Sequence, residues 1–299
     1  MKAHILALLT LLILLNSSGG KEPSNSRRPQ SESELRYWLQ IMAHDYRYSI
    51  EEMSKALGLT KSKIHQELKR LKISSANRPK RKKGDPLNVL PYPGGRPPRI
   101  GFLEGAIRPQ RETKVDIFTP WDESSYVVAD IPEAIWSNLG LTYLAHTHVP
   151  TVWTKAKIQL KPLEWKRGAD GTYEMERRLP NGIVFGTRVT PGKDAVKMEQ
   201  WLTNGTKKKL TGLRVQNCVM LKGAKGFAQQ TNENKIFRGS FAICHSSDKK
   251  RWIITAWQPI HRAWGNTRCP CLHADPQFPD CPPGETKRIQ GWLSFYEGG

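Results

Sequence analysis

Residues 251–296 read RWIITAWQPIHRAWGNTRCPCLHADPQFPDCPPGETKRIQGWLSFY, and both ends of this stretch have the pattern of β-strands. Large apolar side chains occupy both faces of residues 251–257, and residues 289–296 are rich in aromatic and branched side chains. Between these predicted strands lie about thirty residues without helical or strand periodicity, and a loop of that length inside a compact domain is usually functional or disordered. Its cysteines, histidines and prolines indicate an ordered loop.

This loop contains four side chains that can form disulfides or bind metals: Cys269, Cys271, His273 and Cys281. A disulfide from Cys281 to Cys269 or Cys271 would close a loop of roughly ten residues and contribute about 2–3 kcal/mol. The four side chains are also zinc-type donors, although structural zinc sites commonly place two residues between paired ligands. The sequence favours the disulfide, with a divalent metal and free thiols as the alternatives.

Further β-type segments precede this stretch and are separated by turn residues. The predicted strands are residues 114–118, 125–131, 141–148, 152–160, 172–178, 183–189, 195–203, 210–221 and 236–244. Only residues 132–139 are predicted to form a short helical turn. About a dozen strands with short connections predict a mainly β chain with one large antiparallel β-sandwich.

The preceding part of the chain has the signals of three helices. Ser31 with Glu34 and Ser49 with Glu52 form two capping boxes, each ahead of an apolar stripe, and Thr60 precedes a third stripe. A basic segment rich in proline and glycine follows. The predicted organisation is a signal peptide at 1–20, a polar leader at 21–30, a three-helix unit resembling a helix-turn-helix at 31–73, a linker at 74–98 and the β-sandwich at 99–299.

The last of these helices could act as a DNA-reading helix. Its outward side chains would be Lys61, Lys63, Gln66, Lys69 and Arg70. Three-helix units are also common as purely structural modules, and a signal peptide directs a chain away from the cytoplasm. Nucleic acid binding is therefore the alternative function rather than the expected one.

The first twenty residues have the pattern of a secretory signal, because Lys2 precedes an apolar run at residues 5–15 that ends in small polar residues. That run is shorter than the roughly twenty residues a spanning helix needs, so we expect an exported protein without a transmembrane span after signal removal, with an uncleaved N-terminal anchor as the alternative. The chain has 47 basic and 27 acidic residues, a formal charge of +20. This excess favours an anionic polymer as partner, although a solvated basic surface has the same composition.

Residues 99–151, 213–235 and 269–286 resemble a group of uncharacterised exported proteins of planctomycete-type bacteria, and the resemblance covers nearly the whole chain. It implies no particular activity. The long run of strands also resembles the β-supersandwich of galactose mutarotase-like and sugar-binding domains, although no stretch matches a mutarotase catalytic motif. This second resemblance implies a supersandwich-like fold and a carbohydrate ligand.

Three histidines are the candidate catalytic residues. His146 and His148 are two positions apart at the end of a predicted strand, so both imidazoles face the same side and can converge on one ion or substrate. His261 lies in the long loop. The histidines would act as acid/base groups or as ligands of a divalent metal.

Five further residues are candidates for ligand binding. Arg214 and Gln216 share a polar strand face that suits hydroxyl or carboxylate groups. Arg262 and Trp264 lie close to His261, and Trp121 occupies a polar loop, so both tryptophans are expected to be exposed and able to stack on sugar rings.

The sequence contains no Gly-x-Ser-x-Gly elbow, no His-Glu-x-x-His pair and no Gly-x4-Gly-Lys phosphate loop, so it leaves open whether the protein is an enzyme. The expected function is that of an exported β-sandwich protein that binds or processes carbohydrate or another polyhydroxylated ligand. The alternatives are a nucleic-acid-binding or regulatory protein and a structural envelope protein without ligand chemistry.

Overall fold

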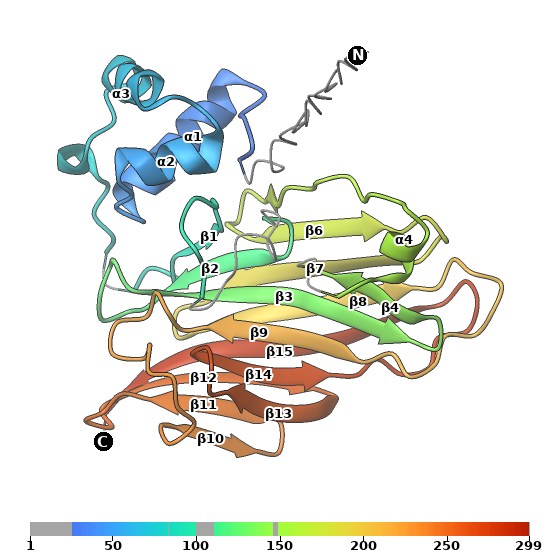
Figure 1. Ribbon diagram of the computed structural model, residues 1–299. Coiled ribbons are helices and arrows are strands. Elements are labelled where there is room, and N and C mark those ends of the chain that lie inside the picture. Colours follow the sequence, from blue (N-terminus) through green and yellow to red (C-terminus); the bar gives the residue numbers. More distant parts are fainter. Residues whose placement is uncertain (1–25, 83, 100–110, 146–148, 299) are drawn as a thin grey trace, which may run out of the picture.

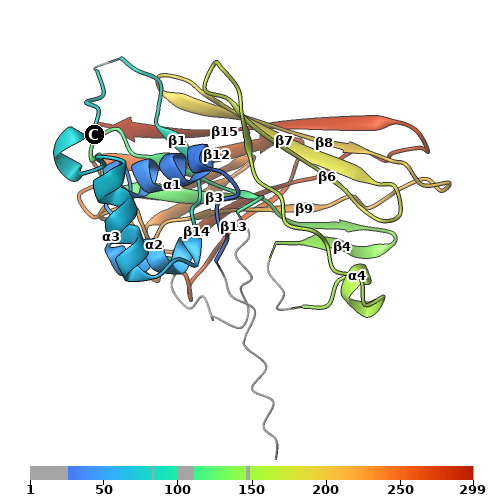
Figure 2. The ribbon, with the colours of Figure 1, turned by 90° about the horizontal axis from the view of Figure 1, so that it is seen from above.

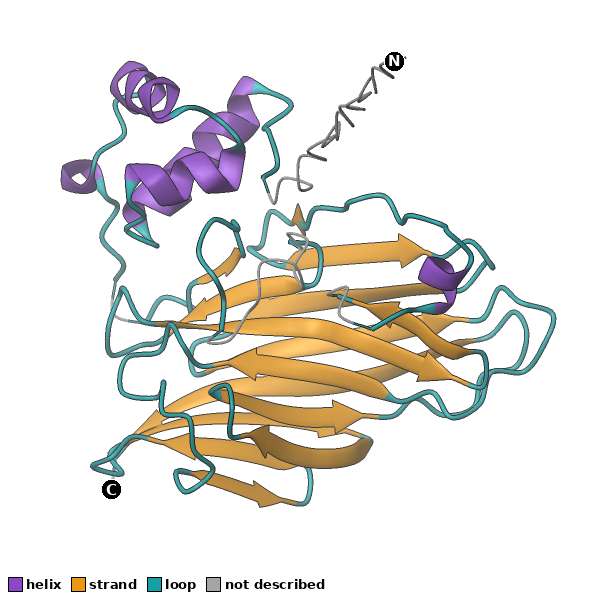
Figure 3. Ribbon diagram, in the orientation of Figure 1, coloured by secondary structure: helices purple, strands orange, loops and turns teal. Residues whose placement is uncertain are grey.

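The computed structural model describes residues 26–82, 84–99, 111–145 and 149–298. Two large antiparallel sheets lie against each other, and a group of helices lies beside one end of them (Figures 1 and 3). The predicted antiparallel β-sandwich is therefore confirmed. The proposed signal peptide lies outside the described residues.

Within the described residues, the first sheet has seven strands, and the second has eight. Along the first sheet the order is β1 (Val89–Pro91), β2 (Lys114–Phe118), β3 (Tyr126–Ser137), β9 (Val215–Met220), β14 (Cys271–Pro276) and β13 (Ile260–Asn266), with β4 (Gly140–Leu144) paired to the far part of β3. Along the second sheet the order is β10 (Lys235–Arg238), β11 (Phe241–His245), β12 (Arg251–Gln258), β15 (Thr286–Glu297), β8 (Ala195–Thr203), β7 (Val184–Pro191), β6 (Tyr173–Arg178) and β5 (Lys166–Arg167).

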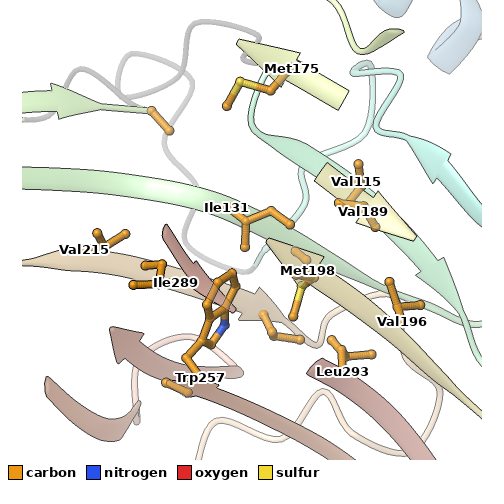
Figure 4. Close-up of a cluster of buried hydrophobic side chains, with 14 of the residues drawn as sticks. Val115, Ile131, Met175, Val189, Val196, Met198, Val215, Trp257, Ile289 and Leu293 are labelled. Atoms are coloured by element: carbon orange, nitrogen blue, oxygen red, sulfur yellow. The ribbon is translucent and has the colours of Figure 1, made fainter. Parts of the chain in front are cut away.

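The main hydrophobic core fills the space between the two sheets. Val215 of the seven-stranded sheet and Trp257, Ile289 and Leu293 of the eight-stranded sheet all contribute to it (Figure 4). Along a strand, successive side chains point to opposite faces, so Val215 and Val219 belong to this core whereas Cys218 and Met220 do not. Below, the face turned away from the eight-stranded sheet is called the outer face of the seven-stranded sheet.

The three predicted helices are confirmed as α1 (Glu32–His44), α2 (Ile50–Leu57) and α3 (Lys61–Arg70). Their N-caps are Ser31, Ser49 and Thr60, and each side chain accepts a hydrogen bond from the third backbone N–H of its helix, which satisfies one of the unpaired donors there. A short 3-10 turn, η1 (Ser75–Asn77), follows.

These helices share a second hydrophobic core with the outer face of the seven-stranded sheet. Tyr46 packs on Phe118 and Tyr126, and its hydroxyl donates to the carbonyl oxygen of Pro91 at 3.2 Å. Arg96 forms an ion pair with Glu52 of α2, with an N···O distance of 2.6 Å. In Figure 2 the three helices α1, α2 and α3 gather at one end of the sandwich, while β4 lies toward the other end. The helical unit is thus packed against the outer face of the seven-stranded sheet.

One segment of the predicted linker belongs to the seven-stranded sheet. Residues 89–91 lie within the predicted linker at 74–98, but they form β1 and pair with β2. Because the strand consists of only three residues and ends in a proline, its apolar side chains gave no recognisable alternation.

The structure also corrects three local predictions. Residues 152–160 contain α4 (Val152–Lys155), not a strand, because Thr151 caps a helical turn there. Residues 132–137 continue β3 beyond a register shift instead of forming a helical turn. Residues 236–244 form two strands, since Gly239 adopts a φ of +56° and allows a tight turn between β10 and β11.

The long loop predicted between residues 257 and 289 is largely a hairpin of β13 and β14. Its strands are short and flanked by prolines, and their polar side chains masked the strand pattern. Among the described residues, no helix has the length and apolar character needed to cross a membrane.

Candidate functional site

The candidate site lies where β9 and β14 separate. Their backbone pairing stops after Leu272 pairs with Val219. Past this pair of residues, side chains of β14 replace its backbone as hydrogen-bond partners of Asn217. The Asn217 N–H donates to Asp275 Oδ1 at 3.2 Å, and the Asn217 carbonyl oxygen lies 2.9 Å from His273 Nδ1. The separation of the strands therefore fixes one carboxylate and one imidazole by contacts with the backbone.

Asp275 accepts hydrogen bonds from two side chains of the neighbouring strand β13, one cationic and one aromatic. Its Oδ2 accepts hydrogen bonds from Arg262 Nε at 2.9 Å and from Trp264 Nε1 at 2.7 Å. Asp275 itself is 1% exposed. Burial raises the pKa of this carboxyl, and His273, Trp264 and Arg262 oppose that rise by stabilising the charged form.

A cavity of about 270 Å³ opens beside this carboxylate. It is lined by Trp136, Arg214, Val215, His261, Arg262 and Asp275, and is called the Asp275 pocket below. Arg214, His261 and Arg262 are exposed, whereas Trp136 is half-buried. The pocket therefore has a cationic rim and an aromatic wall above a buried acid.

Gln216 follows Val215, which lines the pocket, and its side chain forms a hydrogen bond with the carboxylate of Glu133. Its Nε2 donates to Glu133 Oε2 at 2.7 Å, and the same oxygen lies 4.0 Å from His273 Nδ1. Burial lowers the pKa of His273, but Cys271, Glu133 and Asp275 outweigh it and raise the pKa to about 9. The surroundings of His273 thus favour a positive charge on or near its ring.

Four predicted site residues, Arg214, His261, Arg262 and Trp264, are brought together here. Trp264 is only half-buried, and its ring stacks on that of His273, with centroids 4.0 Å apart and planes 8° apart. His146 and His148 lie outside the described residues.

Trp121 does not join this group. Its ring packs on Phe227 and Phe295, with centroids 5.9 and 5.5 Å apart, so the prediction that it is exposed is wrong. Packing on these aromatic side chains overrides the polar sequence around it.

All five cysteines lie within the described residues and are free thiols, so the structure does not contain the predicted disulfide. Cys281 belongs to the core between the sheets, whereas Cys269 and Cys271 lie in the core of the outer face. The sheet separates the thiols that the disulfide would join.

Cys218, and not Cys281, lies beside Cys271 and His273. One possible ligand atom from each of these three residues lies within 4.8 Å of those of the other two. Cys269 Sγ lies 3.6 Å from Cys271 Sγ. Burial raises the pKa of Cys218 to about 11. These four residues, Cys218, Cys269, Cys271 and His273, are called the thiol cluster.

The candidate DNA-reading side chains of α3 are exposed, but several of them are occupied. Lys61 pairs with Glu51 at 3.3 Å and Lys63 with Glu67 at 2.7 Å, and Arg70 binds both Glu67 and Glu32. Gln66 accepts from Lys63 at 3.2 Å, and Lys69 is exposed. These ion pairs reduce the charge that the helix offers to phosphates.

Sequence reasoning did not place Cys218, Glu133 and Asp275 together with Arg262 and Trp264. A usable signal was present, because Cys271, His273 and Asp275 recur at every second position, as polar residues on one strand face do. The flanking prolines hid that strand. Glu133 and Cys218 come close to His273 only through the pairing of distant strands, so the residues next to them in the sequence do not reveal this proximity.

The chain matches no protein-family model and no curated protein sequence. Similar solved structures include the Slr1438 protein from Synechocystis, with 8% identity over 62% of this chain and 88% of that one and a TM-score of 0.37. A polysaccharide lyase has 11% identity over 72% and 33% of the two chains, with a TM-score of 0.39. YeaD of Salmonella typhimurium, a proposed mutarotase, has 7% identity over 62% and 94%, with a TM-score of 0.33. All three TM-scores lie below 0.5, so these likenesses assign no activity or ligand to this chain.

Proposed function

We propose that this chain is a carbohydrate-binding β-sandwich protein that binds an acidic saccharide in the Asp275 pocket. The observation that carries the proposal is the arrangement of Arg262 and Trp264, both held by the buried carboxylate of Asp275 beside an open cavity. Side chains fixed by such contacts lose little conformational entropy when a ligand binds.

The rim of the pocket suits a ligand that bears a carboxylate. Arg262 uses Nε to bind Asp275, yet its side chain is 52% exposed, which leaves its terminal amino groups accessible. Arg214 and His261 line the same cavity. Guanidinium groups bind carboxylates with two parallel hydrogen bonds, so this cluster selects an acid over a neutral molecule.

The wall of the pocket suits a sugar ring. Trp136 is half-buried and lines the cavity, so part of its apolar surface is accessible to the C–H groups of a pyranose. The volume of about 270 Å³ is close to the lower end of ligand pockets, about 300 Å³. We therefore expect one acidic sugar unit of a chain to occupy the pocket.

Isothermal titration calorimetry with oligouronides and with the matching neutral oligosaccharides tests this function. We expect Arg262→Gln to weaken oligouronide binding about 10- to 100-fold, because a hydrogen bond between charged groups contributes about 1.5–3 kcal/mol.

Arg188→Gln is the matched control. Arg188 is 53% exposed and also binds one carboxylate through Nε, that of Glu174, but it lies in the eight-stranded sheet. It should leave affinity unchanged. Equal weakening by both variants, equal affinity for neutral oligosaccharides, or no binding of oligouronides by the wild-type chain would each contradict the proposal.

A further inference from the structure

We infer that the thiol cluster is a four-coordinate zinc-type metal site formed by Cys218, Cys269, Cys271 and His273. This site is distinct from the Asp275 pocket, and the inference does not depend on the proposed carbohydrate function. It comes from side chains of β9, of β14 and of the turn before β14, which only the folded sheet brings together.

The spacing of the donor atoms fits a tetrahedral ion. Cys269 Sγ and Cys271 Sγ are 3.6 Å apart, and Cys271 Sγ lies 3.2 Å from His273 Nε2. With Zn–S bonds of about 2.3 Å and Zn–N bonds of about 2.0 Å, neighbouring ligand atoms of a tetrahedral site are separated by roughly 3.5–3.8 Å. These two separations match an ion bound by Cys271 and by either neighbour. Cys269 lies outside the group of three whose ligand atoms are all within 4.8 Å of one another, so its side chain must move closer to Cys218 and His273 to complete the tetrahedron.

The imidazole of His273 is oriented as a metal ligand. A carbonyl oxygen can only accept, so Nδ1, which faces the Asn217 carbonyl oxygen at 2.9 Å, must carry a proton. In the neutral ring Nε2 then presents its lone pair toward Cys271. Metal-bound histidines usually donate their other N–H to a carbonyl or carboxylate in this way. The stacked Trp264 ring further restricts rotation of the imidazole.

The Arg99 guanidinium offsets the charge of the metal and its thiolate ligands. Three thiolates and one divalent cation leave a net charge of −1, and the Arg99 guanidinium lies beside them, with Nη1 3.4 Å from Cys269 Sγ. Binding would release the three thiol protons together with any proton on His273 Nε2, and would form three metal–sulfur bonds and one metal–nitrogen bond. All four ligand residues are at most 3% exposed.

Such a site is structural in character. Four protein ligands complete the coordination of zinc and leave no position for a substrate or water. The ion would join β9 to β14 where their backbone pairing ends. It would also fix the position of His273. Because His273 and Asp275 both contact backbone groups of Asn217, this would stabilise the sheet beside the Asp275 pocket.

Metal analysis of the full-length chain purified under reducing conditions tests the site, followed by exchange for Co²⁺ and optical spectroscopy. We expect about one zinc per chain and, with cobalt, the visible bands of a tetrahedral ion together with thiolate charge-transfer absorption. Cys218→Ser should lower the metal content at least tenfold.

Cys281→Ser is the matched control, because Cys281 is also a buried free thiol and its Sγ lies against the carbonyl oxygen of Glu285, 3.2 Å away. It should retain the metal. The reverse result, with metal kept by Cys218→Ser and lost by Cys281→Ser, would overturn the site.

X-ray absorption of the wild-type zinc protein keeps the inference falsifiable if Cys218→Ser fails to fold. It should show three sulfur atoms at about 2.3 Å and one nitrogen at about 2.0 Å. A folded wild-type chain that binds no zinc after anaerobic reconstitution, or a disulfide between cluster cysteines in the native protein, would refute the inference.

Discussion

The shared core between the helical unit and the sandwich makes a specific prediction about Tyr46. Its ring is 2% exposed and packs on Tyr48, Phe118 and Tyr126, with centroids 5.4, 5.2 and 5.3 Å away. Two of these partners belong to the strands β2 and β3. Tyr46→Ala should therefore destabilise both parts of the molecule together.

The expected loss is about 3–5 kcal/mol, the usual cost of removing a buried aromatic side chain and leaving a cavity. Roughly 1 kcal/mol of this belongs to the hydrogen bond between the Tyr46 hydroxyl and the Pro91 carbonyl oxygen. Tyr46→Phe should therefore cost only about 1 kcal/mol. Tyr46→Ala should lower the urea midpoint by about 1–2 M, given the slope expected for a domain of this size.

Urea unfolding followed by two probes measures this effect. Circular dichroism at 222 nm reports mainly on the helices, and tryptophan fluorescence reports mainly on the sandwich, because nine of the ten tryptophans lie between residues 121 and 292. Both transitions should coincide and shift together. The control is Tyr296→Ala, whose side chain is 53% exposed and should cost less than about 1 kcal/mol. Loss of the helical signal at low urea, with an unchanged fluorescence midpoint, would refute the shared core.

Two further predictions concern charge and the site. Burial raises the pKa of the Asp122 carboxyl, but hydrogen bonds from Lys225 and Ser124 outweigh it and lower that pKa to about 2. The stabilisation of the folded state by this carboxylate should therefore be present above about pH 4 and lost as the pH falls toward 2. Because Lys225 is 62% exposed, Lys225→Met should cost only about 1 kcal/mol at pH 6 and almost nothing at pH 2 in urea unfolding; an equal cost at both pH values would contradict this. Trp264→Phe removes the hydrogen bond to Asp275 and should lower the free energy of unfolding by about 1–2 kcal/mol. In calorimetry it should also weaken oligouronide binding. The control Trp252→Phe, on the eight-stranded sheet, should leave affinity unchanged.

Local patterns in the sequence predicted much of the secondary structure. Residues 114–118 and 195–203 form strands with the predicted bounds, and the caps at Ser49 and Thr60 begin helices as expected. These features depend on side-chain alternation and on hydrogen bonds within a few residues, so neighbouring residues are sufficient to reveal them. The predictions were wrong where prolines or short strands obscured the period, as in β1 and β14.

The candidate site was only partly predictable for the same reason. Arg262 and Trp264 were chosen because aromatic and cationic side chains occur together in one polar segment, which is a local property. Their partner Asp275 follows more than ten residues later, on the next strand. The amide of Gln216 reaches Glu133 across 83 positions of sequence, and that contact follows from the pairing of β3 with β9.

The sequence by itself determined the residue types, the capped helices and most strands, because these follow from short-range sterics, hydrogen bonding and the burial of alternate side chains. Only the tertiary structure decided which cysteines meet. Cys281 is separated from Cys269 and Cys271 by a sheet, whereas the distant Cys218 comes next to Cys271 on a neighbouring strand. The physical reason is that a sheet assigns side chains to its two faces by strand register, and register between distant strands is set by packing of the whole core.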